Sequence, residues 1–143
     1  MRFLYVAPRY HTNQVPIIRG LKRKGHEVCF LSQYAGKVED YSDLTPTVIG
    51  YSRIFLFFDR VYMALMKNRD AYAGDRKMKC GFPPIGKLKR AIRDSHGNVA
   101  ILRERSVYSI CAYLLCKKYK IPAILYNQSP LWEDCIKNDP AHR

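Results

Sequence analysis

The first 36 residues form a strand–helix–strand pattern, and this pattern constrains the fold more than any other stretch. Residues 3–7 (FLYVA) are an almost unbroken apolar run, typical of a strand that is buried on both faces of a parallel sheet. Apolar side chains then recur at helical spacing over residues 15–22. Residues 28–31 (VCFL) are a second apolar run. Two such strands joined by a helix predict a parallel pair with a right-handed crossover.

The limits of this first helix are marked by residues with known preferences for helix ends. Pro8 stops the first strand, and Pro16 falls in the first helical turn, where the missing N–H costs little. Thr12 or Asn13 is the expected cap. Gly25 is expected just beyond the last turn, where a left-handed backbone suits glycine.

The rest of the chain continues the alternation of strands and helices. The expected strands are residues 47–51, 99–102 and 121–126, and the expected helices are residues 53–67, 85–95 and 106–119. Ser52, Ser106 and the pair Pro83–Pro84 supply helix starts. This order predicts one α/β domain with a Rossmann-like parallel sheet of about five strands and helices on both faces. Residues 33–46 are expected to be a solvated loop, and residues 68–82 a connector without periodicity.

The helix expected over residues 53–67 is apolar nearly all round. Such a helix is buried under another layer, or it meets a partner or a membrane surface. We favour the buried alternative. No apolar run approaches the length of a membrane span, and there is no signal peptide.

The formal charge of +13 is concentrated in one segment. Residues 67–93 hold nine Lys or Arg against two Asp. A solvated cationic face, an anionic lipid surface and nucleic acid are the three interpretations. Nucleic acid is disfavoured because no aromatic stacking platform accompanies the charges. The candidate anion or membrane surface comprises Lys77, Lys79, Lys87, Lys89, Arg90 and Arg93.

Several site classes are excluded by their missing motifs. The five cysteines include no C-x-x-C pair and the histidines no H-x-x-x-H pair, so we expect no metal site and reduced thiols in a cytosol-like compartment. The stretch Gly81–Leu88 nearly matches a phosphate-binding loop, but Leu88 replaces the required Ser or Thr and no strand precedes it. The first connector lacks G-x-G-x-x-G, which disfavours nicotinamide or flavin cofactors.

Three polar connectors follow strands at the edge where ligands collect in parallel sheets. They are residues 8–14, 103–106 and 127–130. His11 in the first connector is a candidate general base or sugar-binding group, with an ordinary loop histidine as the alternative.

Three stretches resemble the N-terminal half of family 4 glycosyltransferases of the GT-B fold. They are residues 2–11 with Gly25-His26-Glu27-Val28, residues 99–106 with the helix after them, and residues 121–130. The resemblance implies the acceptor-binding domain of an enzyme that transfers a sugar, with retention, from a nucleotide-sugar to an acceptor. The reduced thiols predict a cytoplasmic protein, and the anionic-lipid interpretation of the basic segment would place it at the inner face of the membrane. The nucleotide-sugar is expected on a second domain, and no further cofactor is expected. The chain lacks the donor-binding domain of such enzymes and the last elements of the first domain, so we expect residues 1–143 to be inactive alone.

The resemblance also implies a site. His11 and Asn127 would be catalytic, with Asn127 standing where many relatives have histidine; the glycine pair of many relatives is replaced by Pro8 to His11. Asn13 starts a helix whose N–H groups could face a phosphate, and an arginine could hold an anionic acceptor unless Glu104 pairs with it. The substrate-binding candidates are Arg9, Tyr10, Asn13, Arg103, Glu104, Arg105, Gln128 and Ser129. The alternative function is a non-catalytic basic module for an anionic membrane surface or nucleic acid.

Overall fold

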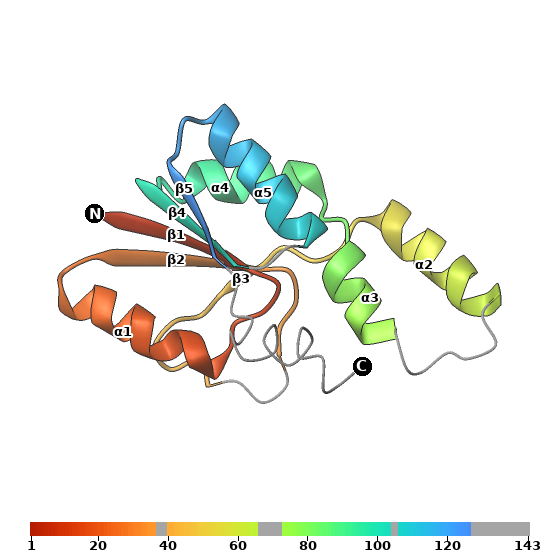
Figure 1. The fold of residues 1–143 in the computed structure, drawn as a ribbon, viewed down its shortest axis with the longest axis horizontal. Coiled ribbons are helices and arrows are strands. Elements are labelled where there is room, and N and C mark those ends of the chain that lie inside the picture. The colour runs from red at the N-terminus through yellow and green to blue at the C-terminus, as the bar shows by residue number, and fades with distance from the viewer. Residues whose placement is uncertain (37–39, 66–72, 104–105, 127–143) are drawn as a thin grey trace, which may run out of the picture.

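The computed structural model describes residues 1–36, 40–65, 73–103 and 106–126 and contains a five-stranded sheet in which all paired strands are parallel (Figure 1). The strand order is β3-β2-β1-β4-β5. The strands are β1 Arg2–Ala7, β2 Glu27–Ser32, β3 Thr47–Val48, β4 Val99–Arg103 and β5 Ala123–Tyr126. The predicted Rossmann-like α/β class is thus confirmed.

Helices cover both faces of the sheet. Helix α1 (Val15–Arg23), preceded by the 3₁₀ turn η1 (Thr12–Gln14), lies on one face, and α4 (Ile85–Asp94) and α5 (Val107–Lys118) lie on the other (Figure 1). The central strand β1 alternates between the two cores. Leu4 and Val6 belong to the cluster under α4 and α5, whereas Tyr5 and Ala7 belong to the cluster under α1. All four side chains are fully buried, as the apolar run predicts.

The predicted helix ends are largely confirmed. After α1, the Gly25 N–H donates to the Lys22 carbonyl and the His26 N–H to the Leu21 carbonyl, while Gly25 has a φ of +76°. These two bonds define a Schellman motif, in which glycine avoids the strain of a left-handed backbone. Ser52 and Ser106 cap α2 and α5, since their Oγ atoms accept the backbone N–H groups of Phe55 and Ser109.

Two boundaries differ from the prediction because of backbone conformation and packing. The third strand is two residues long, since Gly50 has a φ of +86° and leaves the extended conformation. The helix expected over residues 85–95 ends at Asp94, and His96, with a φ of 48°, is the left-handed residue that follows it. Gly97 instead allows a close approach, because a Cβ there would lie 2.9 Å from Leu4 Cβ.

Two segments expected to be irregular carry structure. Residues 73–80 form helix α3 (Ala73–Cys80), so the prediction of a connector without secondary structure is wrong there. In the loop after β2, Tyr41 and Leu44 pack against the α1-side core, and Asp43 accepts a hydrogen bond from Arg19 Nε at 2.9 Å. This part of the loop covers the core and is not simply solvated.

Helix α2 (Arg53–Leu65) is not the buried core helix that the sequence favours. It projects beyond the carboxyl ends of the strands, next to α3, and covers neither face of the sheet (Figure 1). Its apolar side chains are largely exposed, including Leu65 at 78% and Phe58 at 64%. Among the described residues, no helix combines the length and apolar character needed to cross a membrane.

Candidate functional site

The candidate site is the carboxyl edge of the sheet, where the ends of β1, β2, β4 and β5 lie side by side. In the register, Ala7 pairs with Ser32, and Arg103 pairs with Tyr126. The connectors that follow these strands therefore begin at one edge, as predicted. Of the three expected connectors, residues 104–105 and 127–130 lie outside the described residues, and with them Glu104, Arg105, Asn127, Gln128 and Ser129.

His11 caps the turn that leads into α1, a role that the sequence assigns to Thr12 or Asn13. Its Nδ1 accepts the Asn13 backbone N–H at 3.2 Å, and its own backbone N–H donates to Gln14 Oε1 at 2.9 Å. This is a capping box in which histidine stands in the usual place of Ser or Thr. The side chain is half-buried.

The cap determines which nitrogen of His11 can act on a ligand. A neutral imidazole that accepts a hydrogen bond at Nδ1 carries its proton at Nε2. Nε2 is then a hydrogen-bond donor, suited to the oxygen of a hydroxyl or phosphate. A general base would need the opposite tautomer, which the cap disfavours.

Tyr10 and Asn13 have structural roles that differ from the predicted ones. The Tyr10 side chain is 1% exposed and packs edge-on against Phe30 at a ring-centroid distance of 5.1 Å, so it has no surface to offer a substrate. The Asn13 N–H is already bonded to His11, and the next two N–H groups, of Gln14 and Val15, bond to the carbonyls of His11 and Thr12. The N–H groups of Asn13, Gln14 and Val15 are thus already bonded within the chain and are not available to a phosphate.

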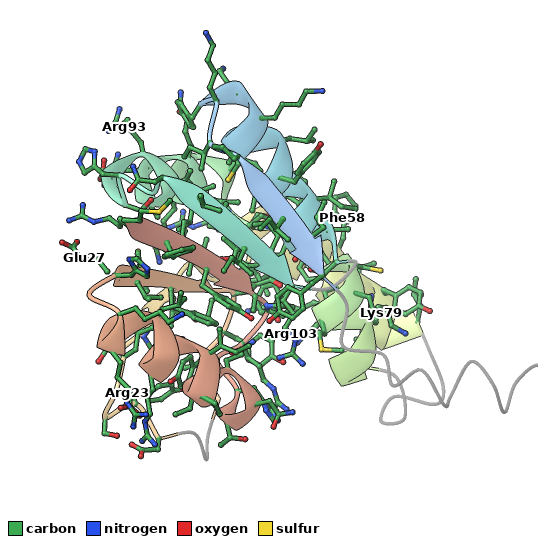
Figure 2. The ribbon with its side chains drawn as sticks, turned by 60° about the vertical axis from the view of Figure 1, so that its left-hand side comes forward. Arg23, Glu27, Phe58, Lys79, Arg93 and Arg103 are labelled. Atoms are coloured by element: carbon green, nitrogen blue, oxygen red, sulfur yellow. The ribbon has the colours of Figure 1, made fainter. Side chains whose placement is uncertain are left out.

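Arg103 ends β4 on the side of the sheet that faces α1. Ile101, two residues earlier, packs in the α1-side core, and side chains two apart in a strand share a face. The Arg103 carbonyl accepts a hydrogen bond from Ser109 Oγ at 2.7 Å, which fixes the end of β4 to the first turn of α5. Figure 2 shows Arg103 at the carboxyl edge. Arg9, after β1, is exposed.

Gln33 is a central residue of this edge that the sequence reasoning missed. Its side chain is fully buried, and Nε2 donates to the Gly81 carbonyl at 2.7 Å. Its backbone N–H donates to the Pro8 carbonyl, and its own carbonyl accepts the Gly50 N–H, each at 2.9 Å. Gln33 therefore joins the ends of β1 and β2 to both ends of the segment that carries α2 and α3. In the sequence, the only indication of this role is that Gln33, a residue with an amide side chain, directly follows the apolar strand β2.

Several buried polar atoms lie near this edge. The hydroxyls of Tyr5 and Tyr126, the side-chain nitrogen of Gln14 and the hydroxyl of Ser32 have no hydrogen-bond partner in the described part of the chain. Burial raises the pKa of Tyr126 to about 12, so its phenol stays protonated at neutral pH. The edge thus has hydrogen-bonding capacity that the described residues do not use.

The basic segment does not form one continuous surface. Figure 2 shows Arg93 and Lys79 on opposite sides of the molecule, Arg93 beside the amino ends of the strands and Lys79 on α3. Lys77 pairs with Asp59 at 3.3 Å, and Lys87 Nζ donates to the Val48 carbonyl at 2.7 Å. The exposed cations of α4 that remain together are Lys89, Arg90 and Arg93, which line a shallow hollow of about 260 Å³.

The chain matches no protein-family model, no curated protein and no solved structure. The fold and the candidate edge therefore stand on the geometry alone. No group of three or more His, Cys, Asp or Glu side chains suited to a metal ion occurs in residues 1–36, 40–65, 73–103 and 106–126.

Proposed function

We propose that this domain binds the acceptor in a glycosyltransferase whose nucleotide-sugar is held by a second domain. The observation that carries the proposal is the convergence of Arg9, His11 and Arg103 on the carboxyl edge of a parallel sheet. That edge is where α/β sheets bind ligands. The resemblance of the three stretches to family 4 glycosyltransferases supplies the reaction class.

His11 and Arg103 would have different tasks. The Nε2–H of His11 would donate a hydrogen bond to a hydroxyl or phosphate oxygen of the substrate, because Nδ1 is engaged by the cap. The guanidinium of Arg103 would hold an anionic group of the acceptor in a two-point contact. Neither task requires proton abstraction by this domain.

The test is sugar transfer by the full-length protein, measured with a panel of radiolabelled nucleotide-sugars. Asparagine is an effective helix cap, so His11→Asn retains the cap while removing the Nε2 donor. We expect kcat/KM to fall about ten- to a hundredfold for His11→Asn, the range for losing a hydrogen bond to a buried or charged partner. Arg103→Ala should lower kcat/KM by a similar factor, mainly through KM.

A stability measurement separates loss of function from loss of folding. Thermal melting of His11→Asn should match the wild-type chain, and His11→Ala should melt lower. If a transferase activity is found and both His11→Asn and Arg103→Ala keep it unchanged, the carboxyl edge is not the acceptor site. If no nucleotide-sugar is turned over by the full-length protein, the reaction class is wrong.

A further inference from the structure

We propose that helices α2 and α3 together form an anchor that inserts the apolar side of α2 into the surface of an anionic lipid bilayer. The apolar side of α2 is defined here as Ile54, Phe57, Phe58, Val61 and Leu65. This inference concerns a surface away from the sheet edge and does not depend on sugar transfer.

The apolar side of α2 is a single exposed stripe. Its members follow one another at steps of three, one, three and four residues, so they share one face of the helix. Ile54 is 72% exposed, Phe57 63% and Leu65 78%. Contiguous exposed apolar side chains of this size mark a surface that another apolar phase covers.

The acidic residue of α2 lies beside this stripe and is paired with two cations. Asp59, on the side facing α3, is 5% exposed and forms ion pairs with Arg76 and with Lys77. These two ion pairs, from Arg76 and Lys77 of α3 to the one carboxylate of Asp59, hold α2 against α3. The carboxylate of Asp59 is therefore matched by two cations, which leaves no unpaired negative charge on Arg53–Leu65.

Cations lie on both margins of the stripe. Arg53 and Arg60 are exposed and, being seven residues apart, lie two turns apart along one margin. Arg76 lies on the other margin, with its guanidinium carbon 4.1 Å from the centre of the Tyr62 ring. On this second margin is a shallow, mainly apolar hollow of about 350 Å³, lined by Phe55, Phe58, Asp59, Val61, Tyr62, Leu65 and Arg76.

The charges favour an anionic bilayer over a second copy of the chain. Two copies joined through this stripe would bring their Arg53 and Arg60 margins together in a chain whose formal charge is +13. Anionic headgroups would instead neutralise these cations, each strengthening binding about fivefold. A helix of 13 residues is about 20 Å long, which suits a helix lying in the interface.

Flotation of the 143-residue chain with vesicles tests the proposal. The vesicles are phosphatidylcholine alone or phosphatidylcholine with phosphatidylglycerol. We expect salt-sensitive binding only to the anionic vesicles. Phe57→Ser/Phe58→Ser should weaken binding at least about tenfold through lost apolar burial. Arg53→Gln/Arg60→Gln should weaken it roughly twenty-five-fold.

Matched controls locate the effect on α2. Ile110→Ser/Leu114→Ser removes two apolar side chains of α5 that are 53% and 58% exposed, and Lys89→Gln/Arg90→Gln removes two exposed cations of α4. Both controls should bind as the wild-type chain does. Equal losses in the α4 or α5 controls would overturn the assignment to α2. So would a wild-type chain that ignores anionic vesicles, or one that forms dimers which Phe57→Ser/Phe58→Ser dissociates.

Discussion

Replacing Gly81 by alanine tests whether the segment carrying α2 and α3 is held by close packing against the end of β2. An alanine Cβ would lie 2.3 Å from the Lys77 carbonyl oxygen, 2.5 Å from Tyr51 Cε1 and 2.9 Å from Gln33 Nε2. Distances below 3.0 Å are not tolerated by real Cβ atoms, and one of these contacts is to backbone. The last turn of α3, the Tyr51 ring and the Gln33 amide must therefore all shift away from residue 81.

The cost follows from two effects. Overpacking in a well-packed region costs about 1–3 kcal/mol. Separation of Gly81 from Gln33 also breaks the 2.7 Å hydrogen bond and leaves a fully buried amide without a partner, which costs about 1–3 kcal/mol. Movement that relieves the overpacking also breaks the hydrogen bond, so the two costs do not add in full, and we expect a total of about 2–4 kcal/mol. For a chain of this length, that lowers Tm by roughly 6–16 °C.

Gly20→Ala is the matched control because it adds the same methyl group in the middle of α1, where nothing lies within 4 Å of the new Cβ. This variant should be more stable by about 0.5–1 kcal/mol, since alanine favours the helix. Urea denaturation followed by circular dichroism measures both variants. A Gly81→Ala chain as stable as Gly20→Ala would refute the close-packing argument. In a double-mutant cycle with Gln33→Met, we expect the two changes to be coupled by at least about 0.5 kcal/mol.

Three further predictions concern the free energy of unfolding, and one concerns activity. His11→Ala should cost about 1 kcal/mol and His11→Asn almost nothing, because only asparagine preserves the cap; equal losses would contradict the capping role. His96→Gly should stabilise the chain by about 1 kcal/mol by relieving its left-handed backbone. An unchanged free energy of unfolding would mean that the contacts of the His96 side chain stabilise the fold by as much as the backbone strain destabilises it. The hydrogen bond from Arg19 lowers the pKa of Asp43, so the ion pair stabilises the fold above the ordinary aspartate pKa of about 4 and less as pH falls below it. Asp43→Asn should therefore be less stable than wild type at pH 7 and approach it as the pH falls through the lowered pKa of Asp43, and a difference independent of pH would exclude this linkage. Residues 1–143 alone should show no sugar transfer, and turnover of any nucleotide-sugar by this chain would contradict the need for a second domain.

The sequence predicts those features that depend on neighbouring residues. The apolar run of β1, the serine caps at Ser52 and Ser106 and the glycine at Gly25 all act within a turn or a strand. Their outcomes are the parallel sheet, the C-terminal end of α1 and the starts of α2 and α5, and these are confirmed. The convergence of connectors at one edge also follows from the sequence, because parallel strands end on the same side.

The tertiary structure decides what depends on residues distant in the chain. The sequence pattern of α2 is compatible with a core helix, and only the placement of α2 beyond the sheet leaves Leu65 and Phe58 exposed. Tyr10 lies in the connector after β1, where ligand-binding residues are expected, yet contact with Phe30 buries its side chain. Gln33 and Gly81 are 48 residues apart and meet only in the folded chain. Hydrophobic periodicity specifies which side of an element is apolar, but whether protein, lipid or water meets that side is set by packing between elements.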